Sequence, residues 1–135
     1  MKLATRYGLA GIGGLALLSF GHWLREGRAI VGQPSEYLLG VLPNIAASIA
    51  VAFVLLSIWT DRNGPLTFAA ARHRFLICAT ISGVGLIAWE FVQLTGDRLV
   101  FDPHDISATG IGLCAAGSLF VALTPKTMDN DCQNG

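Results

Sequence analysis

The chain has 135 residues, of which 53% are hydrophobic and only 13% are charged, and its mean hydropathy is +0.57. About a quarter of the residues in soluble domains are charged, so this composition indicates a membrane protein. Nine basic and nine acidic residues give a formal net charge of zero, and without a basic block the sequence argues against nucleic acid as a partner.

The first predicted element is an apolar run over residues 7–24, which is just long enough to cross a bilayer. Lys2 and Arg6 precede this run, so a secretory signal is a competing interpretation. No clear small-x-small cleavage site precedes the charged residues that begin at Arg25, which favours a membrane-spanning helix.

The second apolar run covers residues 37–59 and follows a polar connection. Pro43 interrupts its first third, where it can kink or start the helix. Asn44 and Ser48 are four residues apart and therefore share a helix face, which favours hydrogen bonding between helices.

The third run is predicted over residues 75–94, after a turn at 60–65 and a segment, 66–74, that could begin a helix at the membrane interface. Glu90 and Gln93 fall on one side of its last turn, because residues three apart are neighbours on a helix.

The fourth helix is predicted to span the membrane over residues 105–123. Asp102 can serve as its N-cap, Pro103 suits the first helical position, and Asp105 falls at the third position. Negatively charged side chains stabilise the positive, N-terminal end of the helix dipole, so both acids suit the start of this helix. The segment 125–135 is polar, and we expect it to be disordered.

Two further patterns concern packing and depth. Small residues recur at four-residue spacing, which permits close helix contacts in lipid: Ala10 and Gly14; Ala79 and Gly83; Ala108, Gly112 and Ala116. Aromatic residues fall at or near the proposed ends, as in an interfacial belt: Tyr7, Trp23, Tyr37, Trp59 and Trp89.

Three cysteines lack metal-site spacing and are interpreted as apolar fillers: Cys78, Cys114 and Cys132.

Together these patterns predict an all-α, polytopic membrane protein with one domain, residues 1–124, in which four transmembrane helices form an antiparallel bundle. The bias of Lys and Arg favours cytoplasmic N- and C-termini. The six on that side are Lys2, Arg6, Arg62, Arg72, Arg74 and Lys126, and the three on the other side are Arg25, Arg28 and Arg98.

Polar residues gather at the opposite, outer ends of the predicted helices, and they form the candidate ligand site. A carboxylate within an apolar segment costs about 2.5–3.5 kcal/mol on insertion scales, so it is a functional hypothesis by default. The predicted ligand-binding residues are Glu90, Gln93, Arg98, Asp102, Asp105, Thr109 and Asn44, and His22 and Ser48 fall at the same ends.

The order Glu90, Gln93, Arg98, Asp105 and Gly112 resembles the VanZ-like family of small bacterial integral membrane proteins. Thr109 stands where many members have asparagine, and Gly96-Asp97 replaces their usual proline before the arginine. The resemblance implies a multi-pass protein of the bacterial cytoplasmic membrane. The family's founding members are linked to teicoplanin resistance, without a settled mechanism.

The functional expectation is a non-enzymatic polar pocket at the outer leaflet that holds the headgroup of an envelope lipid or lipid-linked precursor. Arg98 would donate to phosphate or carboxylate, while Glu90 and Asp105 would accept from hydroxyl, amide or ammonium groups. We expect no cofactor and no metal, and homo-oligomerisation remains open.

Three alternatives remain. Two carboxylates could act as general acid and base in a membrane-embedded hydrolase or transferase. Glu90, Arg98 and Asp105 could instead pair as a purely structural helix staple. A metal held by Asp102, His104 and Asp105 is weaker, because the two acids already have a capping explanation.

Overall fold

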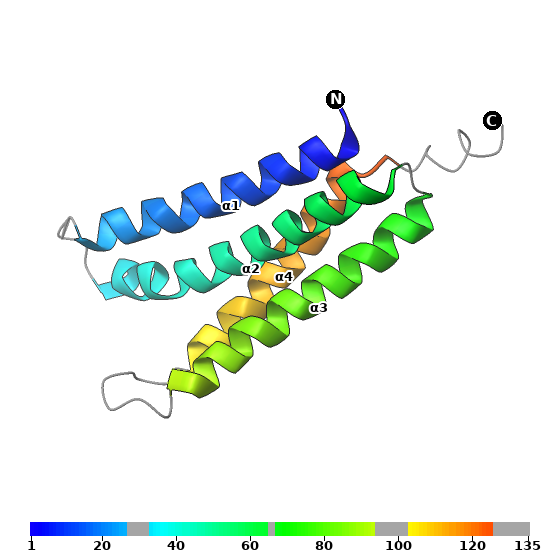
Figure 1. Ribbon diagram of the computed structural model, residues 1–135. Helices are drawn as coiled ribbons and strands as arrows, with labels where there is room; N and C mark the ends of the chain where they lie inside the picture. The colour runs from blue at the N-terminus through cyan, green and yellow to red at the C-terminus, as the bar shows by residue number, and fades with distance from the viewer. Residues whose placement is uncertain (27–32, 65–66, 94–102, 126–135) are drawn as a thin grey trace.

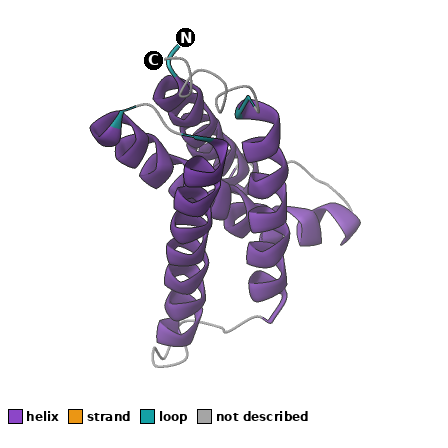
Figure 2. Cartoon of the chain, turned by 90° about the vertical axis from the view of Figure 1, so that its right-hand side faces the viewer, coloured by secondary structure: helices purple, strands orange, loops and turns teal. Residues whose placement is uncertain are grey.

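The computed structural model describes residues 1–26, 33–64, 67–93 and 103–125, and in that part of the chain the only regular element is the α-helix (Figures 1 and 2). The helices are α1 (Leu3–Glu26), α2 (Gln33–Asn63), α3 (Phe68–Gln93) and α4 (Pro103–Leu123). The prediction of an all-α four-helix bundle is confirmed.

All four helices are long and apolar enough to cross a membrane, which gives the molecule the architecture of a multi-pass membrane protein. The mean hydropathy of the four candidate spans is 1.3 in α1, 2.3 in α2, and 1.9 in both α3 and α4. Even α4, with 21 residues, reaches about 32 Å at 1.5 Å per residue, which matches a hydrocarbon core about 30 Å thick.

The helices extend beyond the predicted apolar runs. Helix α2 continues through Pro43 to Asn63, whose side-chain Nδ2 donates to the Trp59 carbonyl at 2.9 Å, and Gly64 follows with a φ of 71°. Helix α3 begins at Phe68, because the Thr67 hydroxyl accepts from the Ala70 backbone N–H at 3.2 Å and acts as the N-cap. The hydrophobic runs therefore marked the membrane core, while capping groups set the helix ends.

Helix α2 is the centre of the bundle and packs against α1, α3 and α4 (Figure 1). Helices α3 and α4 also pack against each other, whereas α1 meets α4 at only a few positions. The sparse contact between α1 and α4 leaves a groove between them.

Glycines allow the closest helix contacts. A Cβ built on Gly14 of α1 would lie 2.9 Å from the backbone nitrogen and Cα of Ala50 in α2, and one built on Gly11 would lie 2.8 Å from a Val54 methyl. A Cβ on Gly112 of α4 would overlap the Ser48 hydroxyl and lie 2.7 Å from the Ile45 carbonyl oxygen. The predicted small-residue contacts at Gly14 and Gly112 are therefore present.

The aromatic core occupies the end of the bundle where α1 starts and α4 ends. Tyr7, Phe53, Phe75 and Phe120 are all buried there, and the rings of Phe75 and Phe120 stack with centroids 4.6 Å apart. Tyr7, predicted to belong to an aromatic belt, faces the interior of the bundle, because its side chain is 0% exposed and its hydroxyl forms a 2.7 Å hydrogen bond with the Thr124 hydroxyl. A buried hydroxyl with a polar partner lets tyrosine sit inside the core.

Large apolar side chains cover the outside of the helices. Val84 is 62% exposed, Ile12 61% and Ile111 60%, and the predicted belt residues Trp23 and Trp89 are also exposed. Small residues therefore lie at the helix contacts and large apolar residues face outward, an arrangement that suits a lipid environment.

Candidate functional site

Helices α2, α3 and α4 meet at one point between the aromatic core and the described candidate residues. The Ser82 hydroxyl of α3 donates to the Ser48 carbonyl of α2 at 3.1 Å, and Gly112 of α4 lies against Ser48 and Ile45. We call Ser48, Ser82 and Gly112 the three-helix junction. Ser48 and Ser82 are buried, with exposed fractions of 0% and 2%, so the junction closes the bundle between its two ends.

Four described candidate residues lie on the far side of this junction from the aromatic core: Asn44, Glu90, Asp105 and Thr109. At 1.5 Å per residue, Asn44 and Thr109 lie about 5–6 Å beyond the junction along α2 and α4. Glu90 on α3 and Asp105 on α4 lie about 10–12 Å beyond it. Figure 1 shows that the end of α3 and the start of α4 are at the same end of the bundle.

Glu90 is buried within a candidate membrane span, with only 3% of its surface exposed. It follows Gly83 by seven residues, or about two turns, and therefore lies on the same α3 face. A Cβ on Gly83 would meet a Leu113 methyl of α4 at 2.9 Å, so this face is directed toward α4. On α4, Ile106 lies two turns before Leu113, and Asp105 is next to it. Because α3 and α4 run in opposite directions, two turns after Gly83 on α3 and two turns before Leu113 on α4 reach about the same level. The Glu90 and Asp105 carboxylates therefore lie at about the same level.

The start of α4 has the predicted local order. Pro103 is the first helical residue, and Asp105 lies in the first turn, half-buried. Thr109 is 2% exposed, and its hydroxyl donates to the Asp105 carbonyl at 3.0 Å within the same helix. That bond occupies the Thr109 proton, while its oxygen can still accept a hydrogen bond.

Asn44 lies at the same end of the bundle and is half-buried on α2, one residue before the Ile45 contact with Gly112. His22, near the end of α1, is exposed. Arg98 and Asp102 lie outside the described residues, as do positions 126–135, while Gln93 is the last residue of α3 and its side chain is not described.

The cluster is suited to polar recognition. The described residues contain no group of three or more His, Cys, Asp or Glu side chains placed to hold a metal ion. Two carboxylates, a hydroxyl and an amide offer acceptors for ammonium, hydroxyl or amide groups, and the Asn44 amide also offers donors.

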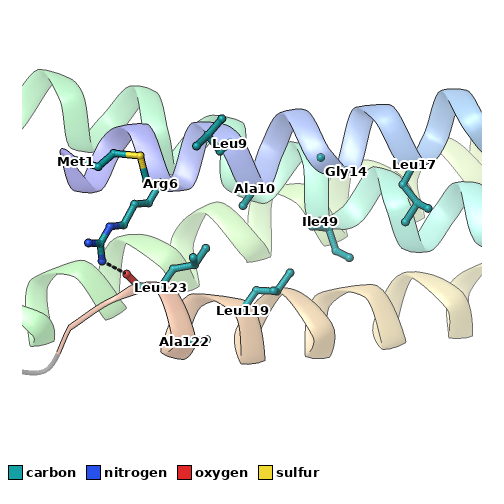
Figure 3. Close-up of a pocket in the computed structure, with 11 residues that line it drawn as sticks. Met1, Arg6, Leu9, Ala10, Gly14, Leu17, Ile49, Leu119, Ala122 and Leu123 are labelled. Atoms are coloured by element: carbon teal, nitrogen blue, oxygen red, sulfur yellow. Dashed lines mark hydrogen bonds between the residues drawn. The ribbon is translucent and has the colours of Figure 1, made fainter.

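Sequence reasoning missed a second feature, at the other end of the bundle. Arg6 and a set of apolar residues line a groove of about 680 Å³ between α1 and α4 (Figure 3). Arg6 entered the sequence argument only as a topology signal, because no local pattern shows that α1 and α4 leave space between them.

Comparison with known proteins adds no relative. No family model matches the chain, and no curated protein or solved structure is significantly similar to it.

Proposed function

We propose that this chain is a VanZ-like, non-enzymatic protein of the bacterial cytoplasmic membrane that holds the polar headgroup of an envelope lipid or lipid-linked precursor. The observation that carries the proposal is the burial of Glu90, 3% exposed, inside a membrane-spanning helix. A buried ionisable group is costly in lipid and typically marks a functional position.

The neighbouring chemistry supports a headgroup ligand. Asp105 lies at the level of Glu90, and Asn44 and Thr109 lie between these acids and the junction, so acceptors are distributed over about one helical turn. Arg98, eight residues after Glu90 in the sequence, would add a fork of donors for phosphate or carboxylate.

The proposed orientation has both termini in the cytoplasm and this site in the outer leaflet. The basic residues support it, because Lys2, Arg6, Arg62, Arg72 and Arg74 all belong to the end where α1 begins and α4 ends. An excess of Lys and Arg is characteristic of cytoplasmic loops.

The test is lipid retention by purified protein in nanodiscs made from total bacterial membrane lipid. We expect wild-type protein to retain a lipid with a polar headgroup, identified by mass spectrometry, and Glu90→Gln to lose it while its thermal midpoint changes little. Asp61→Asn removes an exposed carboxylate at the opposite end of the bundle and serves as the control.

Other outcomes discriminate the alternatives. Conversion of the lipid by wild-type protein but not by Glu90→Gln would identify a hydrolase or transferase. If the charges form only a staple, Glu90→Gln and Arg98→Gln would each destabilise the protein, the double substitution would recover much of that loss, and the retained lipids would not change. Identical lipids in wild-type and folded Glu90→Gln protein would contradict the headgroup site.

A further inference from the structure

A groove runs between α1 and α4 at the end of the molecule opposite Glu90 (Figure 3). Its walls are α1, from Arg6 to Leu17, and the last turns of α4, from Leu119 to Leu123, and Ile49 of α2 lies between them. Apart from Arg6, its lining side chains are apolar or absent. The groove exists because α1 packs along α2 and scarcely meets α4.

We propose that this groove binds one acyl chain of an anionic phospholipid, with the lipid phosphate at Arg6. The length agrees with that occupant. From Arg6 to Leu17 the groove follows α1 for about 16 Å, close to the depth of one leaflet, which is half of a hydrocarbon core about 30 Å thick.

Arg6 is placed to receive the phosphate. Its guanidinium Nη1 donates to the Leu123 carbonyl at 3.5 Å, which is longer than the usual 2.7–3.2 Å for such a bond. Arginine carries five N–H donors in a fork that matches phosphate oxygens. Figure 3 shows the guanidinium at one end of the groove, near Met1, with Leu17 toward the other end.

The charge of this end favours an anionic lipid over a zwitterionic one. Its described charged residues are Lys2, Arg6, Asp61, Arg62, Arg72 and Arg74. Five positive groups thus accompany one carboxylate, and Asp61 lines a smaller depression, of about 310 Å³, between α1 and α2. Basic residues at a membrane surface attract anionic lipids.

A helix from a second copy is the competing occupant of this groove, and the oligomeric state of the protein distinguishes it from a bound lipid.

Gly13 provides a direct test, because it lines the groove and a Cβ built on it meets no atom within 4 Å. Gly13→Leu should therefore fill the groove without moving α1. Gly85 of α3 is the matched control, since it is exposed, also has open space around its Cβ, and lies outside the groove.

The measurement is native mass spectrometry of full-length protein released from nanodiscs containing equal amounts of dioleoyl phosphatidylglycerol and dioleoyl phosphatidylcholine. We expect wild type and Gly85→Leu to retain phosphatidylglycerol preferentially, and Gly13→Leu to lose most of the retained lipid. Arg6→Gln should reduce the preference for phosphatidylglycerol about fivefold, while Arg72→Gln should reduce it less.

Two results would overturn the proposal. One is wild-type retention of phosphatidylglycerol by folded Gly13→Leu protein. The other is a change of oligomeric state. If wild type is a dimer and Gly13→Leu is a monomer with unchanged lipid retention, the groove belongs to a second copy. Glu90→Gln should leave this phosphatidylglycerol in place, so failure here is distinct from failure of the headgroup site.

Discussion

The close contact between α2 and α4 at Gly112 depends on the absence of a side chain. Alanine there would place a methyl group where glycine has only a hydrogen atom. A Cβ on Gly112 would overlap the Ser48 hydroxyl and approach the Ile45 carbonyl oxygen to 2.7 Å. The hydroxyl can rotate, but the carbonyl belongs to the α2 backbone and cannot give way without moving that helix.

We therefore predict that Gly112→Ala lowers the free energy of unfolding by about 1–3 kcal/mol, the usual cost of overpacking a core. Gly110→Ala is the control, because Gly110 lies on the same helix, is exposed, and has open space around its Cβ. Unfolding by SDS in mixed micelles would measure both variants. Equal stability of the two would show that α2 and α4 can separate at little cost.

At the scale of single elements, α2 and α3 are joined by the Ser82 hydroxyl, which donates to the Ser48 carbonyl. We predict that Ser82→Ala destabilises the protein by about 0.6–2 kcal/mol, as hydrogen bonds between membrane helices do. Ser118→Ala should have a smaller effect, because that exposed hydroxyl bonds only to Cys114 of its own helix. Thermal unfolding in detergent would compare them, and a larger loss for Ser118→Ala would exclude this role for Ser82.

The start of α1 and the end of α4 are joined by the bond between Tyr7 and Thr124. Tyr7→Phe and Thr124→Val should each cost about 1–3 kcal/mol, because each leaves one buried hydroxyl without its partner. The double variant should lose less than the sum of the two, and a thermal double-mutant cycle would measure that coupling. Strict additivity would mean that the two hydroxyls do not stabilise each other.

The sequence predicted the number and type of the helices because each run is long and apolar enough to span a bilayer, and length and composition can be read without knowing the tertiary structure. It also located Gly14 and Gly112 correctly, since small residues at four-residue spacing define a face. It could not predict that Tyr7 enters the core, because an aromatic residue near a segment end suits either environment until its neighbours are known.

The candidate site was predictable to a similar extent. Glu90 was identified because a carboxylate is conspicuous in an apolar run, and its burial is consistent with that reading. The Thr109 bond to the Asp105 carbonyl, which occupies the hydroxyl proton of one predicted ligand group, depends on a side-chain rotamer that spacing does not specify. The groove beside Arg6 depends on the separation of α1 from α4, a tertiary property without a local signal.

At the scale of the whole molecule, the three-helix junction separates an end with an aromatic core and a basic surface from an end with acidic residues. In the described part of the chain, the first end holds five basic residues, Lys2, Arg6, Arg62, Arg72 and Arg74, and one acid, Asp61. The second end holds one basic residue, Arg25, and four acids, Glu26, Glu36, Glu90 and Asp105. Because basic residues are retained in the cytoplasm during insertion, this asymmetry predicts which end faces outward.

We predict that, in a cysteine-free background, single cysteines at His22 and His104 react with a membrane-impermeant maleimide added to intact spheroplasts. Both positions are exposed at the acidic end. Cysteines at Asp61 and Asn63, exposed at the basic end, should react only after permeabilisation, and none of these four changes removes a Lys or Arg that sets orientation. Labelling of Asp61→Cys and Asn63→Cys alone in intact cells would reverse the orientation. The Glu90 site would then face the cytoplasmic leaflet, and an outer-leaflet precursor could no longer be its ligand.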